Sequence, residues 1–538
     1  MKSHSLLSFV ACVAVMVLAC AYDASAAEKV SSERSTAPAQ PAQRWRSDSF
    51  PTASVARLQY REMPVADIYK VQRYNDTRNL KAEQIGIGRV AASAGVARTL
   101  PALKWMALRD GSSVARIEVK SPVALAMRVG LDVGQLDPRA ELRFGGSDRP
   151  REVVAMMTGA EMRRIADARG VAWTPATDGE RQIIEVYLPP RVPRNGVKLQ
   201  APQASHLLVN SLNDFKILPK IGESAACNVD TACRVGELGA NFVSAKNAVA
   251  HMVFNYFQAN GTVYGTFICS GTLLADTLTA TQIPYFYSAN HCFYGGDKGA
   301  PLQDLQTVAN TLTTYWGYEA TACNSGVQAA KVPLAGGATV LYADADTGTT
   351  TTTGTDAMLL RLNGTPPAGS EYAGWSSALL ASGSNIIGIH HPQGDAKKVS
   401  SGQQVTRDAY LTTVAWLSGT TEGGSSGSGL FTADGDGYHL RGGLYGGSAS
   451  CANTGTVANT GNRDYYSRFD VIFPNIKQWL APVSTTPIRV NGSHPLIHSP
   501  ASPAAAAPTS SAIPAPAAVP LDSRLPRIRA IRTGPFEP

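Results

Sequence analysis

The alternation of apolar and polar residues predicts short β-strands over much of the first half of the chain. Between about residues 85 and 220, brief apolar runs end at proline or glycine, as at residues 123–131 and 183–188, which is typical of strands. One short helix is expected at residues 160–169, where Thr158 can cap the first turn. This region is therefore expected to form a folded, β-rich domain.

The segments on either side of the globular regions have a different composition. Residues 27–84 are expected to be largely disordered, because the segment up to about residue 60 is rich in Ser, Ala, Pro and Arg and lacks apolar periodicity. Residues 483–538 form a Pro/Ala-rich, low-complexity tail that cannot build a core.

From Cys227 onward, the pattern changes to repeated short runs that alternate or are briefly apolar. Gly, Asn, Asp and Thr separate these runs, and strands at such spacing predict a β-barrel or a β-sandwich. One late helix is expected at residues 474–480, just before Pro482. The clearest runs are residues 248–254, 263–274, 313–318 and 356–362.

Residues 1–26 have the features of a secretion signal. Lys2 supplies a positive charge, residues 6–21 are apolar, and residues 24–26 are small enough for cleavage. The apolar run is too short to predict a membrane span, so we expect a secreted protein. The alternative is lipid attachment at Cys20, because the residues that lead up to it resemble a bacterial lipoprotein cleavage box.

Composition narrows the class of function. The chain has 538 residues, of which 44% are hydrophobic and 17% are charged, so it can hold more than one globular domain. The net charge of +7 is modest, and the arginines are scattered apart from a small cluster in the tail. Because a nucleic-acid surface needs a basic stripe with a reading element, no nucleic-acid partner is expected.

The cysteines divide the chain into two parts. Two of the eight lie in the predicted signal, and an even number remains, which predicts a disulfide framework with fifteen possible connectivities. Zinc is disfavoured, because there is no CxxC pair and no histidine at ligand spacing. Residues 27–220 hold no cysteine and no cluster of catalytic residue types, so we expect them to be a propeptide, separate from the second unit. The remaining cysteines are Cys227, Cys233, Cys269, Cys292, Cys323 and Cys451.

Three residues in the second unit fit the hydrolysis of a peptide bond by a serine. Ser426 lies in the run of glycines and serines at 423–429, where glycines allow a tight turn that exposes an Oγ atom. His291, next to a cysteine, can act as the base, and Asp356, at the head of an apolar run, can orient a buried imidazole.

Other acidic residues fit less well. Asp344 and Asp346 lie in a stretch that predicts a solvated turn. A calcium loop there, or at residues 434–437, is disfavoured because both stretches are too short for an EF-hand. We therefore expect no metal and no cofactor.

Taken together, these motifs resemble the chymotrypsin-fold serine proteases, and specifically the bacterial lysyl endopeptidase family. The resemblance covers about half of the chain, and its motifs are specific as a set although each alone is weak. The matching stretches are residues 227–233, 269–273, 289–292, 315–318, 390–398 and 424–428.

This resemblance implies an all-β fold, with two six-stranded antiparallel β-barrels in residues 221–482, preceded by a β-rich propeptide domain. It makes Ser426 the nucleophile and the backbone N–H groups of Gly424 and Ser426 the oxyanion donors. The disulfides that it implies are Cys227–Cys451, Cys233–Cys323 and Cys269–Cys292.

A preference for lysine requires an acidic partner, because an unpaired buried cation is costly. Members of the resembled family carry an aspartate after the last cysteine, which matches Asp464, and Asp470 is the competing candidate. The chain departs from the family at Tyr445, where lysine-specific relatives tend to have histidine, and it has extra residues before Asp464. His390 and His391 match the family signature, and loop packing is the role expected for them.

These features predict a secreted serine endopeptidase precursor that cleaves proteins or peptides after lysine. Its mature domain is expected to be a monomer, freed from its own propeptide by a cut between Lys220 and Ile221. The alternatives are a trypsin-like protease that cuts after Arg or small residues, and an inactive binding module with a protease fold. An adhesion or structural role is suggested only by the tail.

Overall fold

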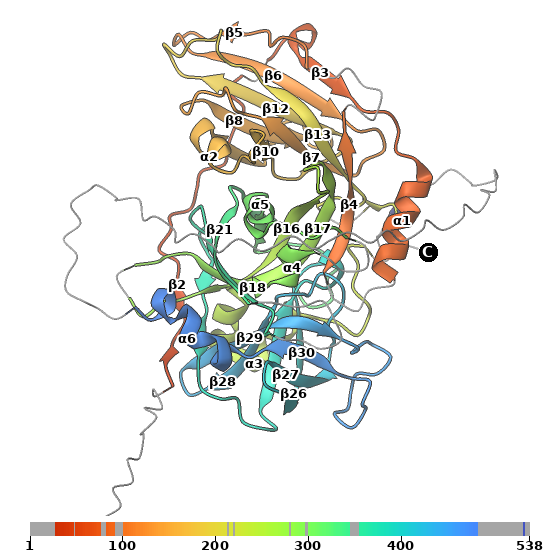
Figure 1. Cartoon of the computed structure of the whole chain (residues 1–538), viewed down its shortest axis with the longest axis vertical. Coiled ribbons are helices and arrows are strands. Elements are labelled where there is room, and N and C mark those ends of the chain that lie inside the picture. The colour runs from red at the N-terminus through yellow and green to blue at the C-terminus, as the bar shows by residue number, and fades with distance from the viewer. Residues whose placement is uncertain are drawn as a thin grey trace, which may run out of the picture.

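Two β-sheets packed face to face form the N-terminal unit, the upper part of Figure 1. One sheet has the order β3-β6-β12-β8-β9 with β5 on β6, and the other contains β10, β7, β13 and β4 with β11 on β7. Inward-facing residues such as Phe144 and Val186 of the first sheet meet Val129 and Leu131 of the second in one buried cluster. The strands are β3 (Ala56–Gln59), β4 (Glu83–Val90), β5 (Met106–Ala107), β6 (Ser113–Lys120), β7 (Ala126–Asp132), β8 (Glu141–Gly146), β9 (Ala155–Thr158), β10 (Val171–Trp173), β11 (Thr177–Asp178), β12 (Arg181–Leu188) and β13 (Gln200–Leu207).

The helix predicted after Thr158 is present as α2 (Gly159–Arg164), although it ends five residues earlier than expected. The Thr158 hydroxyl accepts from the Glu161 N–H at 3.1 Å, and a Glu161 carboxylate oxygen accepts from the Thr158 N–H at 2.7 Å. This capping box satisfies two donors that have no partner within a helix.

The computed structural model describes most of the chain between the predicted signal and the predicted tail. Residues 1–26, with Cys20, lie outside the described residues, as do Lys220 and nearly all of 483–538. In the tail only β31 (Ile531–Arg532) is described, and it pairs with β14 (Phe215–Lys216). The described residues are 27–47, 49–76, 82–91, 100–211, 215–218, 221–278, 281–295, 300–344, 354–482 and 531–532.

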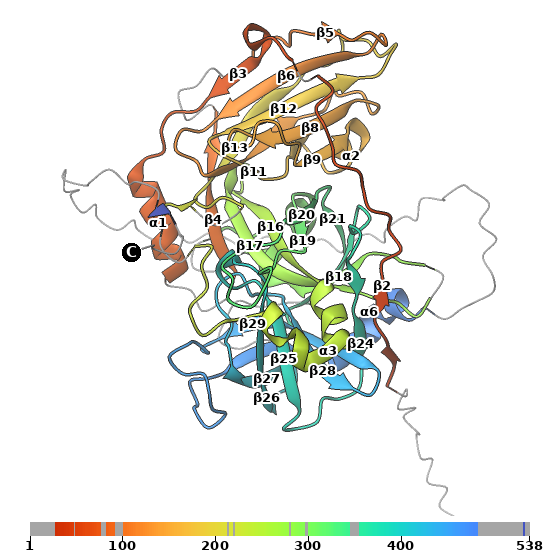
Figure 2. The same ribbon diagram turned by 180° about the vertical axis from the view of Figure 1, so that it is seen from behind.

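Residues 27–84 contain regular structure in their described part, which differs from the disorder expected there. The segment runs in extended form along the side of the molecule in Figure 2 and pairs with strands from the second half of the chain. Backbone hydrogen bonds to these strands hold the segment in place. Such pairing requires no apolar periodicity, so the sequence pattern did not indicate it. Its elements are β1 (Lys29–Val30), β2 (Glu33–Arg34), η1 (Thr52–Ser54) and α1 (Val65–Asp76), in addition to β3 and the start of β4.

The two units share a sheet, and they are therefore not separate in the way that the cysteine distribution suggested. Strand β4 pairs on one edge with β13 of its own unit and on the other with β17 (Val263–Leu274) of the second unit. The result is a twelve-stranded sheet that continues from one unit into the other. Cysteine content predicted where the disulfides lie, but it carries no information about strand pairing.

The first half of the second unit is a curved sheet of six antiparallel strands in the order β19-β16-β17-β18-β22-β21. Among the described strands, β19 and β21 do not pair, so this barrel is open at one seam. Helix α5 (Leu305–Asn310) packs beside the seam against β16 and β21. The strands are β16 (Val249–Phe257), β17, β18 (Tyr285–Ala289), β19 (Thr313–Trp316), β21 (Ala338–Ala343) and β22 (Ala357–Leu362), with β20 (Val332–Leu334) on the outer edge of β19.

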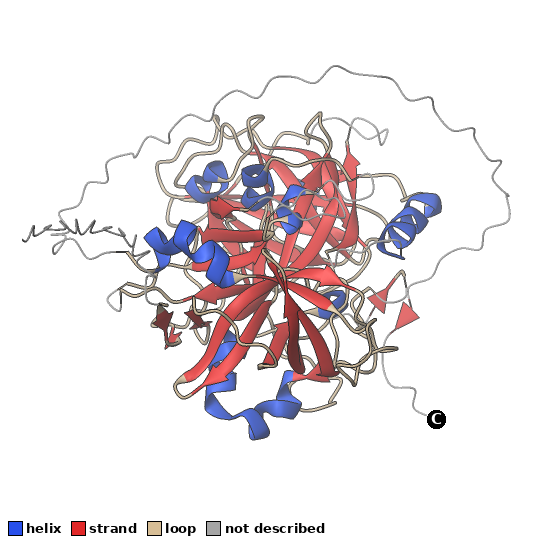
Figure 3. Cartoon of the chain, turned by 60° about the horizontal axis from the view of Figure 1, so that its bottom comes forward, coloured by secondary structure: helices blue, strands red, loops and turns tan. Residues whose placement is uncertain are grey.

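The second half is a closed barrel. Its six antiparallel strands pair in the ring β25-β26-β27-β30-β29-β28, and β28 returns to β25. One closed barrel and one open one, with few helices, confirm the chymotrypsin-like, all-β fold; Figure 3 shows how far strands dominate. The barrel strands are β25 (Asn385–His390), β26 (Lys398–Arg407), β27 (Leu411–Ser418), β28 (Gly429–Asp434), β29 (Gly437–Gly447) and β30 (Asp464–Ser467). The short strands at its edges are β15 (Val229–Asp230), on β26, and β24 (Gly374–Ser376), on β29. Strand β23 (Glu371–Tyr372) pairs with β2 in a separate sheet.

The two longest described helices of the second unit differ from the sequence prediction. Helix α3 (Thr231–Asn247) was not predicted, and its backbone leaves the helical region at Gly239, which has φ of 74°. Helix α6 (Phe469–Leu480) begins five residues before the predicted start and contains Pro474. Glycine and proline weaken the helical signal of a sequence, while in the folded chain the apolar face of α6 is buried by packing.

Arg128 connects the two units through buried hydrogen bonds. This fully buried side chain on β7 donates to the Thr174 carbonyl of its own unit, and to the Asn255 side chain and the Thr311 carbonyl of the second unit. Burial lowers the pKa of Arg128 to about 10, so the guanidinium stays charged at neutral pH.

We expect Arg128→Ala to lower the urea concentration at which the full chain unfolds. The carbonyls of Thr174 and Thr311 would lose a donor, and each buried acceptor left unsatisfied costs about 1–3 kcal/mol. The control is Arg139→Ala, because Arg139 is exposed and pairs only with Asp137. Equal unfolding midpoints for the two variants would contradict the bridging role.

Candidate active site

The structure brings His291, Asp356 and Ser426 into one hydrogen-bonded line. The Nδ1 atom of His291 lies 2.6 Å from Asp356 Oδ2, and its Nε2 atom lies 2.7 Å from Ser426 Oγ. The three residues come from separate places: the first turn of α4 (His291–Tyr294), the residue before β22, and the loop before β28. All three are buried in the full chain, at 3%, 2% and 0% exposure respectively.

Asp356 is held in place by its backbone as well as by its side chain. Its φ of 61° lies in the left-handed region, which aspartate tolerates better than most residues. The Asn290 N–H donates to its carbonyl at 2.7 Å, and the His291 N–H donates to its Oδ1 at 2.8 Å. The carboxylate therefore binds both the backbone and the ring of His291, which fixes the orientation of the imidazole.

The competing carboxylate Asp344 has a different role. Its Oδ2 accepts from the N–H and the hydroxyl of Thr355, at 2.7 and 2.6 Å. It thereby shapes the turn that leads into Asp356. Asp346, the other candidate, lies outside the described residues.

The loop around Ser426 is built on two glycines with positive φ. Gly424 has φ of 82°, and a Cβ atom there would lie 2.8 Å from the His391 carbonyl, so only glycine fits. The Ser270 hydroxyl donates to the Gly424 carbonyl at 3.0 Å, and the Ser270 N–H donates to the Ser426 carbonyl at 2.8 Å. Gly427, with φ of 77°, packs against Ser270 and the end of β18.

The two amides predicted as oxyanion donors belong to this loop. Within the part of the chain that the structure describes, the N–H groups of Gly424 and Ser426 donate to no protein acceptor. Amides without an internal acceptor are available to bind a developing oxyanion.

Disulfides join the cysteines in the three pairs that the resemblance implied. Cys269–Cys292 ties β17 to the residue after His291. The Tyr256 hydroxyl donates to the carbonyls of His291 and Cys292, each at 3.0 Å, on the other side of the same turn. The position of His291 is thus fixed by a covalent link and by backbone contacts. The other pairs are Cys227–Cys451 and Cys233–Cys323.

His390 contacts the loop between β27 and β28, residues 419–428, which we call the nucleophile loop after the predicted nucleophile Ser426. The sequence analysis did not predict this contact. Its Nδ1 lies 2.8 Å from Ser425 Oγ, and its Nε2 lies 3.1 Å from Ser400 Oγ. The ring therefore supports the serine that precedes Ser426, the predicted nucleophile. The family signature indicated the residue, but no local feature of the sequence indicated its partner.

His391 packs in a buried aromatic group. Its ring stacks on Tyr318 at 5.5 Å and contacts His251 at 5.4 Å, and its Nδ1 lies 3.0 Å from the Asp395 carbonyl. Burial lowers the pKa of both His251 and His391 well below the usual value, so both rings are neutral. These contacts agree with the packing role expected for His391.

Asp464 is the first residue of β30 in the closed barrel and contacts Thr421 of the nucleophile loop. It is fully buried, and its Oδ2 accepts from Trp416 Nε1 at 2.7 Å and from Thr421 Oγ1 at 2.6 Å. A Cβ atom on Gly447 would lie 2.3 Å from its Oδ1, so the absence of a side chain there leaves room for the carboxylate. Asp470, the competitor, instead pairs with Arg468.

The aromatic ring of Tyr445 lies beside that of His291. Its ring centroid lies 5.9 Å from that of His291, at an angle of 85°. This is the position where the chain departs from the resembled family.

Among the described residues, two groups of side chains have a spacing that could hold a metal ion. Cys269, His291 and Cys292 lie close together, but both cysteines are in a disulfide. Asp434 and Asp436 lie near His439 at the tip of the β28–β29 hairpin, and Lys29 binds both carboxylates, at 3.1 and 2.5 Å. In the full chain an ammonium group therefore occupies the place where a cation would bind.

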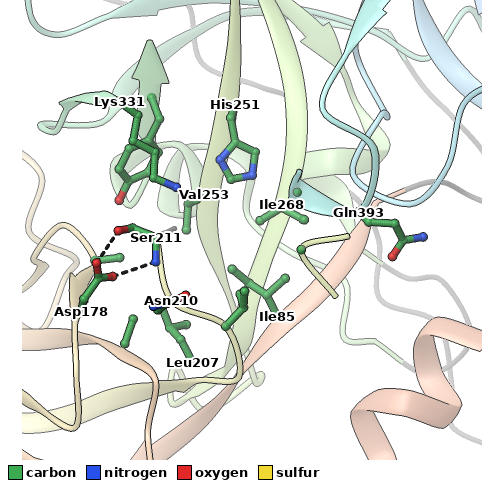
Figure 4. Close-up of a pocket in the computed structure, with 16 residues that line it drawn as sticks. Ile85, Asp178, Leu207, Asn210, Ser211, His251, Val253, Ile268, Lys331 and Gln393 are labelled. Carbon is green, nitrogen blue, oxygen red and sulfur yellow. Dashed lines mark hydrogen bonds between the residues drawn. The ribbon is translucent and has the colours of Figure 1, made fainter. Parts of the chain in front are cut away.

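A cavity lies between the two units, away from the hydrogen-bonded line of His291, Asp356 and Ser426. Figure 4 shows His251 and Lys331 on one side, Leu207 on another, and Asp178 accepting two hydrogen bonds from Ser211. None of His291, Asp356 or Ser426 lines this cavity. It is a feature of the contact between the units.

Comparison with known proteins matches both units of the chain to one family. A family model described as the lysyl endopeptidase C-terminal domain matches residues 221–467, and one described as the lysyl endopeptidase N-terminal domain matches residues 59–208. A lysyl endopeptidase of Pseudomonas aeruginosa is 35% identical over 416 residues, which cover 74% of this chain and 81% of the relative.

One similar solved structure is a thermostable serine protease, AL20, from an extremophilic microorganism. It has a TM-score of 0.27 and 14% identity, and the match covers 42% of this chain and 92% of that one. None of the described helices has both the length and the apolar character needed to cross a membrane.

We expect His390→Ala to lower kcat by up to about 100-fold, because a small displacement of the nucleophile loop misaligns Ser426. KM should change little, since the His390 ring bonds the side chains of Ser425 and Ser400. Steady-state kinetics on a peptide substrate measure both constants. The control is His439→Ala, which removes another buried histidine far from the loop; an equal fall in kcat there would contradict this role.

Proposed function

This chain belongs to the lysyl endopeptidase family and is a serine endopeptidase, and we propose that it cleaves on the carboxyl side of lysine through Ser426, His291 and Asp356. The observation that carries the proposal is the continuous hydrogen-bonded line from Asp356 through His291 to Ser426. A nucleophile, a base and an orienting carboxylate at such distances are what acyl transfer by serine requires.

In the proposed reaction, Ser426 Oγ attacks the carbonyl carbon of the substrate while its proton moves to His291 Nε2. The amides of Gly424 and Ser426 stabilise the oxyanion of the tetrahedral intermediate. His291 then returns the proton to the departing amine, which leaves an acyl-enzyme on Ser426. Water, deprotonated by His291, hydrolyses this ester, and Asp356 stabilises the imidazolium that forms in each half of the reaction.

Asp464 is the proposed partner of the lysine side chain. Its carboxylate is fully buried and receives two hydrogen bonds, so it is held in one orientation. Its neighbour Trp416 belongs to β27 of the closed barrel. Its other neighbour, Thr421, lies five residues before Ser426 in the nucleophile loop. An ammonium group that enters this region would gain a charge partner that it lacks in any apolar pocket.

The two alternatives make different demands on the same residues. A trypsin-like protease of other preference would keep the triad but use Asp464 for packing. An inactive binding module would not need a hydrogen-bonded nucleophile, base and carboxylate, and the geometry of all three favours an enzyme.

We further propose a secreted precursor with a signal at residues 1–26, a propeptide at 27–220 and a protease domain at 221–482. The two family models support the division, because they leave only residues 209–220 between them. A cut after Lys220 would free Ile221, which is buried at 3% exposure, and Gly222, whose N–H donates to the Gln393 carbonyl at 2.7 Å. Lys220 itself lies outside the described residues.

The function is tested by expressing the precursor and assaying the secreted product on matched Lys, Arg and Glu amide substrates. We expect cleavage after lysine and none in Ser426→Ala. Asp464→Asn should lower kcat/KM for lysine about 100-fold or more, since removal of one partner of a buried ion pair costs roughly 3–5 kcal/mol. Asp470→Asn is the matched control. Equal cleavage after arginine would keep the mechanism and reject strict lysine preference.

Processing is tested by N-terminal sequencing of the secreted protease domain. We expect a sequence that begins at Ile221 in the wild type, and an uncut chain in Ser426→Ala if the protease performs the cut itself. A start far from Ile221 would reject this junction, and a cut Ser426→Ala chain would show that another protease acts.

A further inference from the structure

The β28–β29 hairpin brings three side chains with metal-binding atoms together at its tip. Asp434 ends β28, Asp436 lies in the turn, and His439 follows on β29, where it pairs with Thr432. One ligand atom from each of the three lies within 4.8 Å of the others. Two carboxylates and an imidazole suit a divalent transition metal ion better than calcium, which prefers oxygen ligands alone.

The imidazole of His439 is buried and makes no hydrogen bond. The residue has 0% exposure, and neither ring nitrogen has a hydrogen-bond partner within the described part of the chain. Its Nδ1 lies 3.1 Å from an Asp434 oxygen and its Nε2 lies 3.8 Å from an Asp436 oxygen, without the alignment of a hydrogen bond. A buried polar group without a partner is costly, and a bond from one ring nitrogen to a metal ion would reduce this cost.

In the full chain an ammonium group already lies at this tip. Lys29 Nζ contacts Asp434 Oδ2 at 3.1 Å and Asp436 Oδ1 at 2.5 Å, and the Ser31 hydroxyl donates to the other oxygen of Asp436 at 3.0 Å. Lys29 and Ser31 belong to the extended N-terminal segment, which β1 joins to β24. The two carboxylates therefore hold a positive charge that comes from outside the protease domain.

Without this segment, the two carboxylates would lose the charge that Lys29 supplies, and like charges close together disfavour each other. A tetrahedral zinc ion with bonds of about 2.0–2.2 Å holds its donor atoms about 3.3 Å apart. The His439 nitrogen and the Asp434 oxygen are already 3.1 Å apart. The side chains of Asp434 and Asp436 are 40% and 43% exposed, so both carboxylates have room to rotate toward a shared ion.

We propose that Asp434, Asp436 and His439 form a binding site for a divalent transition metal ion such as Zn²⁺, and that Lys29 closes this site while the N-terminal segment is attached. The metal ion and the ammonium group compete for the same two carboxylates. Removal of residues 27–220 opens the site, and the bound ion then links β28 to β29 in the closed barrel. Only this opening step rests on the proposed function.

The first test uses the uncut chain with Ser426→Ala, which prevents self-processing, and counts bound equivalents by isothermal titration with ZnCl₂. We expect Lys29→Ala to bind one equivalent of Zn²⁺ that the parent chain binds at least about 10-fold more weakly, because there the ammonium group competes. The control is Lys70→Ala, which removes an exposed lysine that pairs with Asp67. Identical titrations of Lys29→Ala and its parent would overturn the role of Lys29.

Two further variants, made in the Lys29→Ala chain, assign the ligands. His439→Ala and Asp436→Asn should each weaken this equivalent at least about 100-fold, because loss of a group that only supports a ligand already costs roughly 10- to 100-fold. The control is Asp408→Asn, at an exposed aspartate in the turn between β26 and β27. Tight binding that survives His439→Ala would overturn the site. Asp436 lies in a turn and is partly exposed, so its variant tests the site without repacking the core.

The processed domain supplies an independent measurement. Zn²⁺ should raise its thermal unfolding midpoint, because an ion that binds the folded state stabilises that state. Asp436→Asn should remove this rise and leave cleavage after lysine unchanged. The proposal is overturned if neither Lys29→Ala nor the processed domain binds the additional equivalent. If no processed domain forms, the proposed function fails, whereas the titration of the uncut chain still decides whether the metal site exists.

Discussion

The hydrogen bond from the Ser270 amide to the Ser426 carbonyl links the two barrels at the point where the chemistry is proposed. Ser270 lies on β17, and that strand also carries Cys269, which is bonded to the residue after His291. One strand of the first barrel therefore positions both His291 and the loop that carries Ser426. Any change in how β17 sits relative to the second barrel would change the distance between His291 and Ser426.

The same strand, β17, also connects the N-terminal unit to the site. Its two edges are bonded to β16 and, at different points along its length, to β4 and β18. Where β4 pairs with it, the edge that faces the nucleophile loop is closed. The two units are thus joined by backbone hydrogen bonds beside the loop that carries Ser426.

Buried carboxylates are the second common feature of the site. Asp356, Asp464 and Glu83 are all less than 5% exposed, and each accepts at least one hydrogen bond. Removing a charge from water is costly unless donors replace the lost hydration. The fold supplies such donors in fixed directions, which suits a carboxylate that must orient an imidazole or bind an ammonium group.

Local motifs allowed much of this site to be predicted from the sequence. The glycines around Ser426 and the cysteine next to His291 are short-range signals, and the apolar run after Asp356 marked a strand that the structure contains. The contact of His390 with Ser425 could not be read in this way, because residues 35 positions apart are joined only by the closed barrel.

Long-range pairing was the main feature that the sequence did not reveal. Strand β1 pairs with a segment some 350 residues later, and β4 pairs with β17 across almost 200 residues. Such pairings depend on backbone groups that every residue carries, so composition could not distinguish residues 27–84 from a disordered segment. The open seam between β19 and β21 has the same origin, since a strand pattern does not specify which edges meet.

The most direct test of the account is covalent modification of the processed enzyme by a lysyl chloromethyl ketone, with the norleucyl analogue as control. The lysyl reagent should alkylate His291, as located by peptide mapping, and the norleucyl reagent, which lacks only the terminal amine, should react at least about 100-fold more slowly. That outcome would show that His291 and the anionic pocket at Asp464 belong to one site. Equal rates for the two reagents, or modification elsewhere than His291, would contradict it.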